Sequence, residues 1–369
     1  MVNFRNLAAS LAAASAIGSV VAHPGEVHTP EEVKREIAVH KAQQVKARRS
    51  LAECANSPAA IALKGRAVAR RAATAQKLRE QRGLTKKSLQ SKRDQTALEQ
   101  WSAVDHDVSS TGYTLDTPLA TIFDSNSTCA LVPEVTIGPY FVSGELIRTD
   151  ITDGESGVPL HLDLQFVDTS SCTAVEDLLI DIWHCNATGV YSGVSASGQG
   201  GLDTTTFRGV QATDTDGVAQ FDTIVPGHYT GRAVHIHLLA SADDTILSND
   251  TYEVGSVRHI GQLFFDQSLI TEVEATSPYN TNTQSLTENT SDGIAAEEAT
   301  SDYDPYVDYV RLGDSIEDGL LGFITVGIDT SADYIDSYTP AAHYEEGGGV
   351  DTGNSGGGGG GGGGPPSRK

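Results

Sequence analysis

The sequence predicts an all-β fold, an antiparallel β-sandwich, preceded by a basic helical segment at the N-terminus. Residues 160–166 alternate apolar and polar side chains, which is the period of a strand with one buried face. After about Trp101, short apolar runs are separated by turns that contain Gly, Asp or Asn, and helical periods are few. Residues 29–93 differ, because they are rich in Ala, Arg, Lys and Gln and carry helix-start signals. Many short strands joined by turn residues favour a sandwich.

The first 22 residues have the pattern of a secretory signal peptide. Arg5 supplies the positive flank, and Leu7–Ala22 is an apolar run that ends in small residues before His23. The alternative is a membrane anchor, but this run of about 16 residues is short against the roughly 20 that a membrane-spanning helix needs. We therefore expect a secreted, extracellular protein without a membrane span. Four N-x-Ser/Thr sequons fit such a protein, at Asn126, Asn186, Asn249 and Asn289.

Segment 23–98 is expected to form a basic helical arm. Residues 23–93 hold 17 Lys and Arg against 6 Asp and Glu, whereas the whole chain carries a net charge of −24. Helix-start signals occur at Thr29-Pro30 and again at Ser57-Pro58. The apolar stripe is thin, which leaves two interpretations open: an arm or pro-segment that docks on the acidic domain, or a solvated spacer helix. The acidic remainder of the chain argues against nucleic acid as a partner.

The cysteines bear on the choice between these interpretations. The chain has four, which is too few for a disulfide-built miniprotein and compatible with two bridges in an ordinary domain. Removal of residues 23–93 would take Cys54 away and leave an odd number. An even set mildly favours an arm that stays attached through Cys54. The sequence does not choose among the three connectivities of Cys54, Cys129, Cys172 and Cys185.

The domain that follows the arm spans residues 99–340. Its strand candidates are Leu160–Phe166, Leu178–Trp183, Val218–Ile224, Ala233–Leu239 and Ile260–Phe265. Residues 274–305, rich in Thr, Asn, Glu and Asp, are interpreted as a long loop or insertion. Residues 341–369 are interpreted as a disordered glycine-rich tail, because nine consecutive glycines occupy positions 356–364.

The residues with the most distinctive chemistry lie near position 230. On a strand, His235 and His237 are two residues apart and share a face, while the residues between them point to the core. Two imidazoles on a rigid strand are half of a metal site, although a His-x-His pair alone also arises by chance. Tyr229 enters this strand at a Pro-Gly turn, and Tyr191 ends an earlier run. Two phenolates and two imidazoles favour a hard trivalent cation such as Fe(III), and the cysteines lack metal-binding spacing.

Several longer motifs occur around these residues in a fixed order. They are Gly189-Val190-Tyr191-Ser192, Phe207-Arg208-Gly209-Val210-Gln211, Phe221-x-Thr223-Ile224-x-Pro226-Gly227-x-Tyr229 and Arg232-x-x-His235-Ile236-His237. As an ordered set they resemble the intradiol ring-cleavage dioxygenases, the catechol and protocatechuate dioxygenase family, and look closest to its secreted fungal branch. The resemblance covers about 129–270 and does not extend to residues 23–95 or to the tail.

This resemblance implies an enzyme with a non-haem Fe(III) cofactor. Such an enzyme cleaves catechol-type aromatic rings with O2, between the two hydroxylated carbons, and gives muconate-type diacids. Position by position, the metal ligands match Tyr191, Tyr229, His235 and His237. By the same resemblance, Tyr229 leaves the metal when substrate binds and accepts a substrate proton.

The resemblance assigns three further residues. Arg232 matches the arginine that stabilises charge on the substrate ring. Gln262 matches, more weakly, a glutamine next to the ligands. Tyr140, in Gly138-Pro139-Tyr140-Phe141, resembles an element that lines the substrate pocket. The chain departs from the bacterial enzymes at Ala233, where they usually carry proline.

Two other classes of function stay open at this stage. One is a non-catalytic β-sandwich module that binds phenols or glycans. The other is a copper or Fe(II) oxygenase built on the histidine pair, which would need carboxylate ligands in place of the tyrosines. His184 is expected to pack or form hydrogen bonds, and His228 to face solvent or the pocket rim. The acidic composition favours neutral diols over carboxylated substrates, while the natural diol and the oligomeric state are not determined by the sequence.

Overall fold

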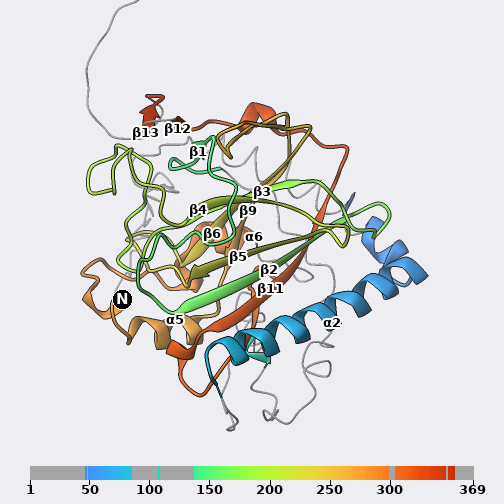
Figure 1. Cartoon of the computed structure of the whole chain (residues 1–369), viewed down its shortest axis with the longest axis horizontal. Coiled ribbons are helices and arrows are strands. Elements are labelled where there is room, and N and C mark those ends of the chain that lie inside the picture. The colour runs from blue at the N-terminus through green and yellow to red at the C-terminus, as the bar shows by residue number, and fades with distance from the viewer. Residues whose placement is uncertain are drawn as a thin grey trace, which may run out of the picture.

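The computed structural model describes residues 46–47, 49–84, 106–108, 137–298, 304–345 and 348–353. Two four-stranded sheets form its framework (Figure 1). One sheet has the order β10-β11-β2-β5, with β10 Asp308–Arg311, β11 Leu320–Ile328, β2 Pro159–Asp168 and β5 Val218–Ile224. The other has the order β4-β3-β6-β9, with β4 Arg208–Ala212, β3 Leu179–Trp183, β6 His235–Ala242 and β9 Ser256–Phe264.

A single large apolar core joins the two sheets. Side chains of both sheets belong to one buried cluster, among them Leu160 and Leu162 of β2, Ile182 of β3, and Ile236 and Leu238 of β6. Two sheets that share a core in this way confirm the β-rich architecture that the sequence predicts. The strands are not uniformly antiparallel, because β11 pairs with β2 in parallel, with Leu320 opposite Leu160. A parallel pair needs a long crossover between its strands, and here most of the domain lies between them.

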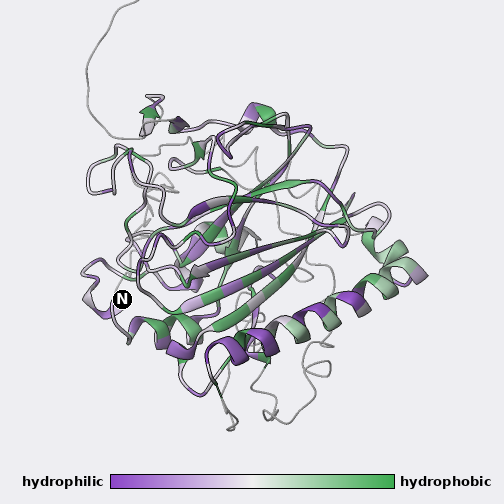
Figure 2. Cartoon of the chain, viewed as in Figure 1, coloured by the Kyte–Doolittle hydropathy of each residue, from purple (hydrophilic) through white to green (hydrophobic). Residues whose placement is uncertain are grey.

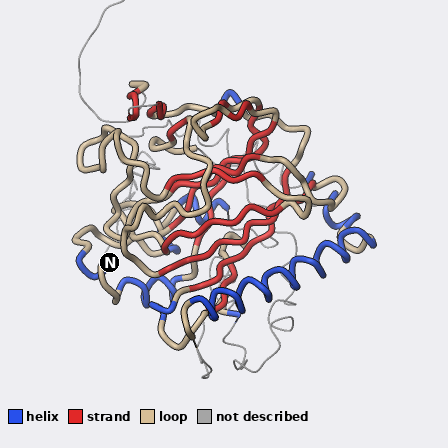
Figure 3. Tube along the Cα trace, viewed as in Figure 1, coloured by secondary structure: helices blue, strands red, loops and turns tan. Residues whose placement is uncertain are grey.

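The polar residues of β2 lie under a helix, although their alternation is typical of a strand with a solvent-facing side. Asp163 is fully buried and Gln165 nearly so. The helix above them is α2, Pro58–Gln81, which crosses the outer face of this sheet next to β2 and β11 (Figures 1 and 3). Both faces of β2 are therefore covered, one by the core and one by α2.

Helix α2 begins at the signal that the sequence contains. The Ser57 hydroxyl accepts a hydrogen bond from the Ala60 amide at 3.2 Å, and Pro58 occupies the first turn. Hydrophilic and hydrophobic residues alternate along its length (Figure 2). Its buried residues recur every three or four positions and form one face: Leu63, Ala67, Arg71, Ala75 and Leu78. The earlier predicted helix start at Thr29 and the predicted signal peptide lie outside the described residues.

Ion pairs hold this basic helix on the acidic domain. Arg70 and Arg71 both donate to Asp163, at 2.8 and 2.9 Å. The Arg82 guanidinium donates to the Asp318 carbonyl at 2.6 Å. The C-terminal half of α2 also shares an apolar cluster with β10 and β11. Over this stretch the arm is docked on the sheet and is not a solvated spacer.

A disulfide fixes the same contact covalently. Cys54, just before α2, is bonded to Cys172, which lies 118 residues further along the chain. Of the described cysteines Cys185 is free and buried, and its thiol donates to the Gly227 carbonyl at 3.2 Å. Burial raises the pKa of that thiol to about 12. The expectation of an even pairing therefore does not hold for Cys185, and Cys129 lies outside the described residues.

The C-terminal segment is folded further than the sequence predicts. A small sheet has the order β1-β12-β13, formed by β1 Val142–Ser143, β12 Ala342–Glu345 and β13 Gly348–Asp351. Ala341 and Ala342 are buried in the cluster that contains Tyr191 and Tyr229. The interpretation of residues 341–369 as a disordered tail is therefore wrong for its first part. The prediction was wrong because strand pairing uses backbone hydrogen bonds, which the glycines of β13 can form without side chains.

The segment predicted as a loop or insertion contains short helices and turns that cover one end of the sandwich. They are the end of α5 Gln267–Glu274, η2 Tyr279–Thr281, η3 Asn289–Ser291 and α6 Gly293–Glu298. The remaining short elements are the β7–β8 hairpin, Thr245–Ile246 with Tyr252–Glu253, and the turns η4 Ile316–Asp318 and η5 Ile335–Ser337. Among the described residues, no helix has the length and apolar character that a membrane crossing requires.

Candidate active site

Strand β6 places the two predicted histidines side by side in the interior. His235 and His237 are almost fully buried, and their Nε2 atoms lie 3.1 Å apart. Ile236, between them, points into the core that joins the sheets. The predicted alternation along this strand is therefore confirmed.

Neighbouring groups fix the orientation of both rings. The Nδ1 atom of His235 lies 2.6 Å from the Ala233 carbonyl, so Nδ1 donates and Nε2 keeps its lone pair facing inward. His237 stacks on Trp183 of β3, with ring centroids 4.8 Å apart and planes 3° from parallel. The two imidazoles are held rigidly before any ligand binds.

The two tyrosines reach the same point from separate loops. The Tyr229 hydroxyl lies 3.3 Å from His235 Nε2. The ring of Tyr191 lies 5.7 Å from that of Tyr229 and 6.1 Å from that of His237. Both tyrosines are buried. Two imidazole nitrogens and two phenolic oxygens therefore converge on one small volume.

Glycines allow the two tyrosine loops to pack backbone against backbone. A Cβ on Gly189 would collide with the His228 carbonyl, and one on Gly227 would collide with the Ala187 carbonyl. Gly189 also has a φ of 79°, which favours glycine. The glycines of both sequence motifs are thus needed to bring Tyr191 and Tyr229 together.

This donor set fits a hard trivalent cation. The Tyr191 hydroxyl is buried and makes no hydrogen bond of ordinary geometry among the described residues. Burial raises the pKa of Tyr191 well above its usual value, and Tyr229 next to it adds to the effect. Burial likewise raises the pKa of Tyr229, which the nearby Arg232 partly offsets. A bound cation would satisfy the orphaned oxygen and supply the charge that deprotonates both phenols.

Among the residues described by the structure, no group of three His, Cys, Asp or Glu side chains is arranged to hold a metal ion. The candidate ligands are therefore Tyr191, Tyr229, His235 and His237. A facial triad of two histidines and one carboxylate, the usual Fe(II) arrangement, is not present in that part of the chain.

Arg232 and Gln262 lie next to these ligands and bind each other. The Arg232 Nη2 donates to the Gln262 Oε1 at 2.7 Å, and both residues are buried. Gln262 is on β9 directly opposite His237 on β6. On the other side, Arg232 Nε donates to the Asp292 Oδ2 at 2.8 Å. Burial alone would lower the pKa of Arg232, but Asp292 raises it above its usual value, so the guanidinium stays charged.

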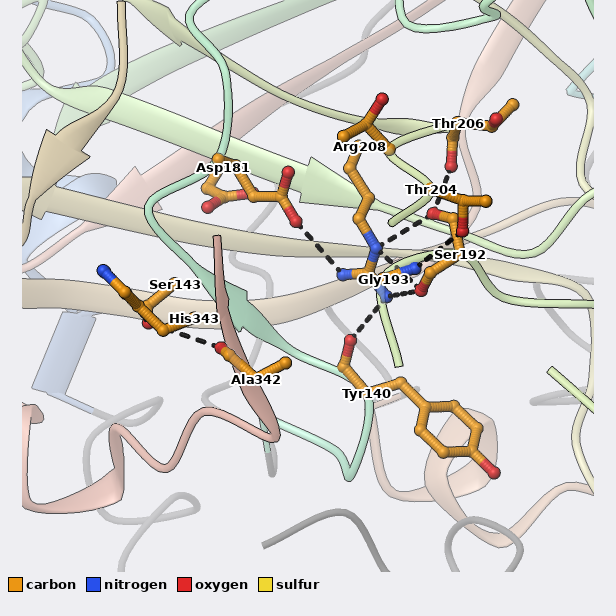
Figure 4. Close-up of polar contacts among 12 residues, drawn as sticks. Tyr140, Ser143, Asp181, Ser192, Gly193, Thr204, Thr206, Arg208, Ala342 and His343 are labelled. Atoms are coloured by element: carbon orange, nitrogen blue, oxygen red, sulfur yellow. Dashed lines mark hydrogen bonds and ion pairs between the residues drawn. The ribbon is translucent and has the colours of Figure 1, made fainter. Parts of the chain in front are cut away.

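Tyr140 lies against Tyr191, one of the candidate metal ligands. Its ring centroid is 5.1 Å from that of Tyr191. Its carbonyl accepts a hydrogen bond from Arg208 Nη2 at 2.7 Å, and the same nitrogen donates to the Ser192 carbonyl at 2.7 Å (Figure 4). Arg208 thus ties the Tyr140 loop to the residue that follows Tyr191.

Two buried carboxylates balance the charge of Arg208. Glu145 Oε1 lies 3.6 Å from Arg208 Nη1. Asp181 also lies near the Arg208 guanidinium (Figure 4) and interacts with its charge. Burial raises the pKa of Glu145 to about 7, although Arg208 opposes the effect. Burial, and then Glu145, raise the pKa of Asp181 well above its usual value. Burial therefore opposes ionisation of both carboxyl groups, and the Arg208 guanidinium favours it.

His184 and His228 have structural contacts. His184 contacts the Cys185 carbonyl at 2.8 Å and the Thr223 hydroxyl at 2.7 Å, as expected of a packed residue. His228 contradicts its prediction, because it is buried and its Nδ1 lies 2.7 Å from Glu274 Oε1. The sequence reasoning missed Asp292 entirely. It stands among many Asp, Glu, Thr and Asn residues, and no local pattern distinguishes it.

Residues 137–245 match a protein-family model described as dioxygenase. This range contains Tyr140, Arg232 and all four candidate metal ligands, whereas Gln262 and Asp292 lie beyond it. A comparison with curated proteins found no match.

Solved structures similar to the chain are also dioxygenases. An intradiol ring-cleavage dioxygenase from Tetranychus urticae is 29% identical over 56% of this chain and 97% of its own, with a TM-score of 0.47. A dioxygenase domain from a Streptomyces species is 25% identical over 55% of this chain and 99% of its own, with a TM-score of 0.37. A catechol 1,2-dioxygenase from an Acinetobacter species is 19% identical over 56% and 65%, with a TM-score of 0.37.

Proposed function

We propose that the chain, whose residues 137–245 match a family model described as dioxygenase, is an intradiol ring-cleavage enzyme: a non-haem Fe(III) dioxygenase acting on catechol-type phenols. Convergence of two buried tyrosines and two buried histidines carries the proposal. Phenolate oxygens are hard, anionic donors and suit the ferric state. The products would be muconate-type diacids that incorporate both atoms of O2.

Each protein residue has a separate task in this reaction. Fe(III), when bound, would act as a Lewis acid that binds the diol and draws electron density from the ring. Tyr191 and His237, packed against Tyr140 and Trp183, hold their positions throughout. Tyr229, whose hydroxyl lies 3.3 Å from His235 Nε2, accepts a proton from the substrate hydroxyl, because a phenolate oxygen is a good general base.

Arg232 and the aromatic walls complete the site. The guanidinium stabilises negative charge that develops on the ring, because it is buried and its position is fixed by hydrogen bonds. Tyr140, packed on Tyr191, would place an apolar ring beside the bound substrate. Gln262 holds the far side of Arg232.

A visible absorption spectrum of the iron-supplied protein tests the proposal. We expect a tyrosinate-to-Fe(III) charge-transfer band, a shift of that band when catechol is added without oxygen, and bleaching when air is admitted. Tyr229→Phe should weaken the band and abolish turnover, whereas Tyr344→Phe, a partly exposed tyrosine in β12, should leave both unchanged. A protein that stays colourless with adequate iron would exclude ferric chemistry and favour the non-catalytic phenol-binding module.

We also propose that the protein is secreted and carries N-linked glycans. The signal-like residues 1–22 and the sequons support this proposal. Asn249 is exposed in the β7–β8 hairpin and can carry a glycan, whereas Asn289 is 1% exposed and donates to the Phe265 carbonyl. Mass spectrometry of the secreted protein should therefore find glycan at Asn249 and none at Asn289.

A further inference from the structure

Asp292 is a buried carboxylate with a complete set of partners beside the candidate active site. Its side chain is fully buried. The Oδ2 atom accepts hydrogen bonds from Arg232 Nε at 2.8 Å and from the Ala233 amide at 2.6 Å. The Oδ1 atom accepts from the Ile294 and Ala295 amides at 2.8 and 2.9 Å. Both oxygens of the Asp292 carboxylate are buried and together accept four hydrogen bonds, so the carboxylate is held in one position.

The contacts of Asp292 extend to the metal ligands. Arg232 stands three residues after Tyr229 and three before His235. The Ala233 residue that donates to Asp292 through its amide also accepts from His235 through its carbonyl. One carboxylate therefore holds both the guanidinium and the backbone that orients a ligand imidazole.

The buried cations described around the site are paired with buried carboxylates before substrate binds. Arg232 is paired with Asp292, and Arg208 lies next to Glu145 and Asp181. All of these groups are buried. A carboxylate on the substrate ring would need a buried cation of its own, because an unpaired charge is costly in a medium of low dielectric constant. Within the described parts of the chain the cations at the site already have partners.

We propose that Asp292 is a positioning residue that fixes Arg232 and, by neutralising it, restricts the site to catechols without a further negative charge. The inference rests on the proposed ring-cleavage function and names a substrate class within it. It assigns a role to a residue outside the family-matched range. Segment 289–298 thereby becomes part of the active site.

Substrate preference is the readout, because a merely structural role would not change it. The iron-supplied wild type, Asp292→Asn and Asp292→Glu would be compared on catechol and on 3,4-dihydroxybenzoate, with oxygen uptake for turnover and anaerobic titration of the visible band for binding. Asp243→Asn is the matched control, since Asp243 forms an ion pair with Arg258 while its side chain is 76% exposed. Iron content and melting temperature of each variant would be measured first.

In Asp292→Asn we expect kcat/KM for catechol to fall about 100-fold, mostly in kcat, because Arg232 loses its fixed position. The ratio of kcat/KM for 3,4-dihydroxybenzoate to that for catechol should rise at least about tenfold, because the guanidinium is no longer neutralised. Asp292→Glu should keep the wild-type preference, and Asp243→Asn should match the wild type in every measurement.

The outcomes separate this inference from the proposed function. If the wild type turns over neither substrate, the proposed function fails and the inference fails with it. If the wild type is active but Asp292→Asn keeps its catechol rate and its preference, only the inference is overturned. If Asp292→Asn does not fold, the wild type decides the question, because a preference for 3,4-dihydroxybenzoate over catechol would overturn the proposed neutral-ring selectivity.

Discussion

Replacement of Asp163 by asparagine tests how the basic helix is held on the sandwich. The Asp163 side chain is fully buried, and the side chains of its partners Arg71 and Arg70 are only 5% and 18% exposed. Removal of one partner of a buried ion pair costs about 3–5 kcal/mol, because the other charge stays buried without compensation. Asparagine keeps the shape and one acceptor oxygen, so we expect a loss near the lower end, about 3 kcal/mol.

The matched control is the pair Arg66–Asp216 on the same helix. Its side chains are 53% and 25% exposed, so Asp216→Asn should cost no more than about 1 kcal/mol. The free energy of unfolding would be measured by guanidinium chloride denaturation, and hydrogen exchange over residues 58–81 would report whether α2 detaches. Equal losses for the two variants would refute the argument that burial determines the strength of these ion pairs.

The Asp163 carboxylate should also make the stability of the protein depend on pH in the acidic range. Burial alone would raise the pKa of Asp163, but Arg70 and Arg71 hold it well below its usual range. Its contribution to stability is therefore present above the unfolded pKa of about 3.9 and is lost as the pH falls toward the folded value. Asp163→Asn should remove this part of the loss of stability in acid. An unchanged dependence of the free energy of unfolding on acidic pH would contradict this role of Asp163.

Three further predictions concern the rest of the framework. Replacement of Cys54 and Cys172 by serine removes a cross-link between residues 118 positions apart, and chain entropy predicts that the free energy of unfolding falls by about 5 kcal/mol. Thermal and denaturant unfolding would measure this fall, and a value below about 1 kcal/mol would contradict the prediction. Because burial raises the pKa of Glu145 to about 7, its contribution to stability is fully present below about 4.5 and is lost as the pH rises to 7. In Glu145→Gln the free energy of unfolding should therefore fall by about 3 kcal/mol less between pH 5 and 8 than it does in the wild type. Denaturant unfolding across that pH range would measure this difference. Arg208→Gln should destabilise by about 3 kcal/mol and should cost less in a Glu145→Gln background, whereas strictly additive losses in a double-mutant cycle would exclude coupling between the two groups.

Much of the site was predictable because its residues lie close together in the sequence. Tyr229, Arg232, His235 and His237 fall within nine residues, and strand periodicity is enough to place both histidines on one face. Strand periodicity does not predict that Tyr191 lies next to this segment. That contact was predicted only from the ordered motifs, which contain the turn glycines. The strands were predicted for the same local reason, and β5 occupies the predicted residues Val218–Ile224.

Errors occurred where the partner of a residue lies far away in the chain. His228 was expected to face solvent or the pocket rim, but it is buried and its Nδ1 lies 2.7 Å from Oε1 of Glu274, 46 residues later. The polar residues of β2 suggested a solvent-facing side, yet α2 covers them and Arg71 reaches Asp163 across 92 residues. The parallel pairing of β11 with β2 was missed because local periodicity is the same in parallel and antiparallel strands.

By itself the sequence determined the strand-rich class, the basic character of the arm and the two tyrosines and two histidines of the candidate metal site, because periodicity, composition and ordered motifs are local properties. Only the tertiary structure decided which charges meet. Asp292 and Arg232 are 60 residues apart, and no acidic residue in that segment differs in pattern from its neighbours. The strength of an ion pair depends on burial and on the other donors that surround it, and both are properties of the folded chain.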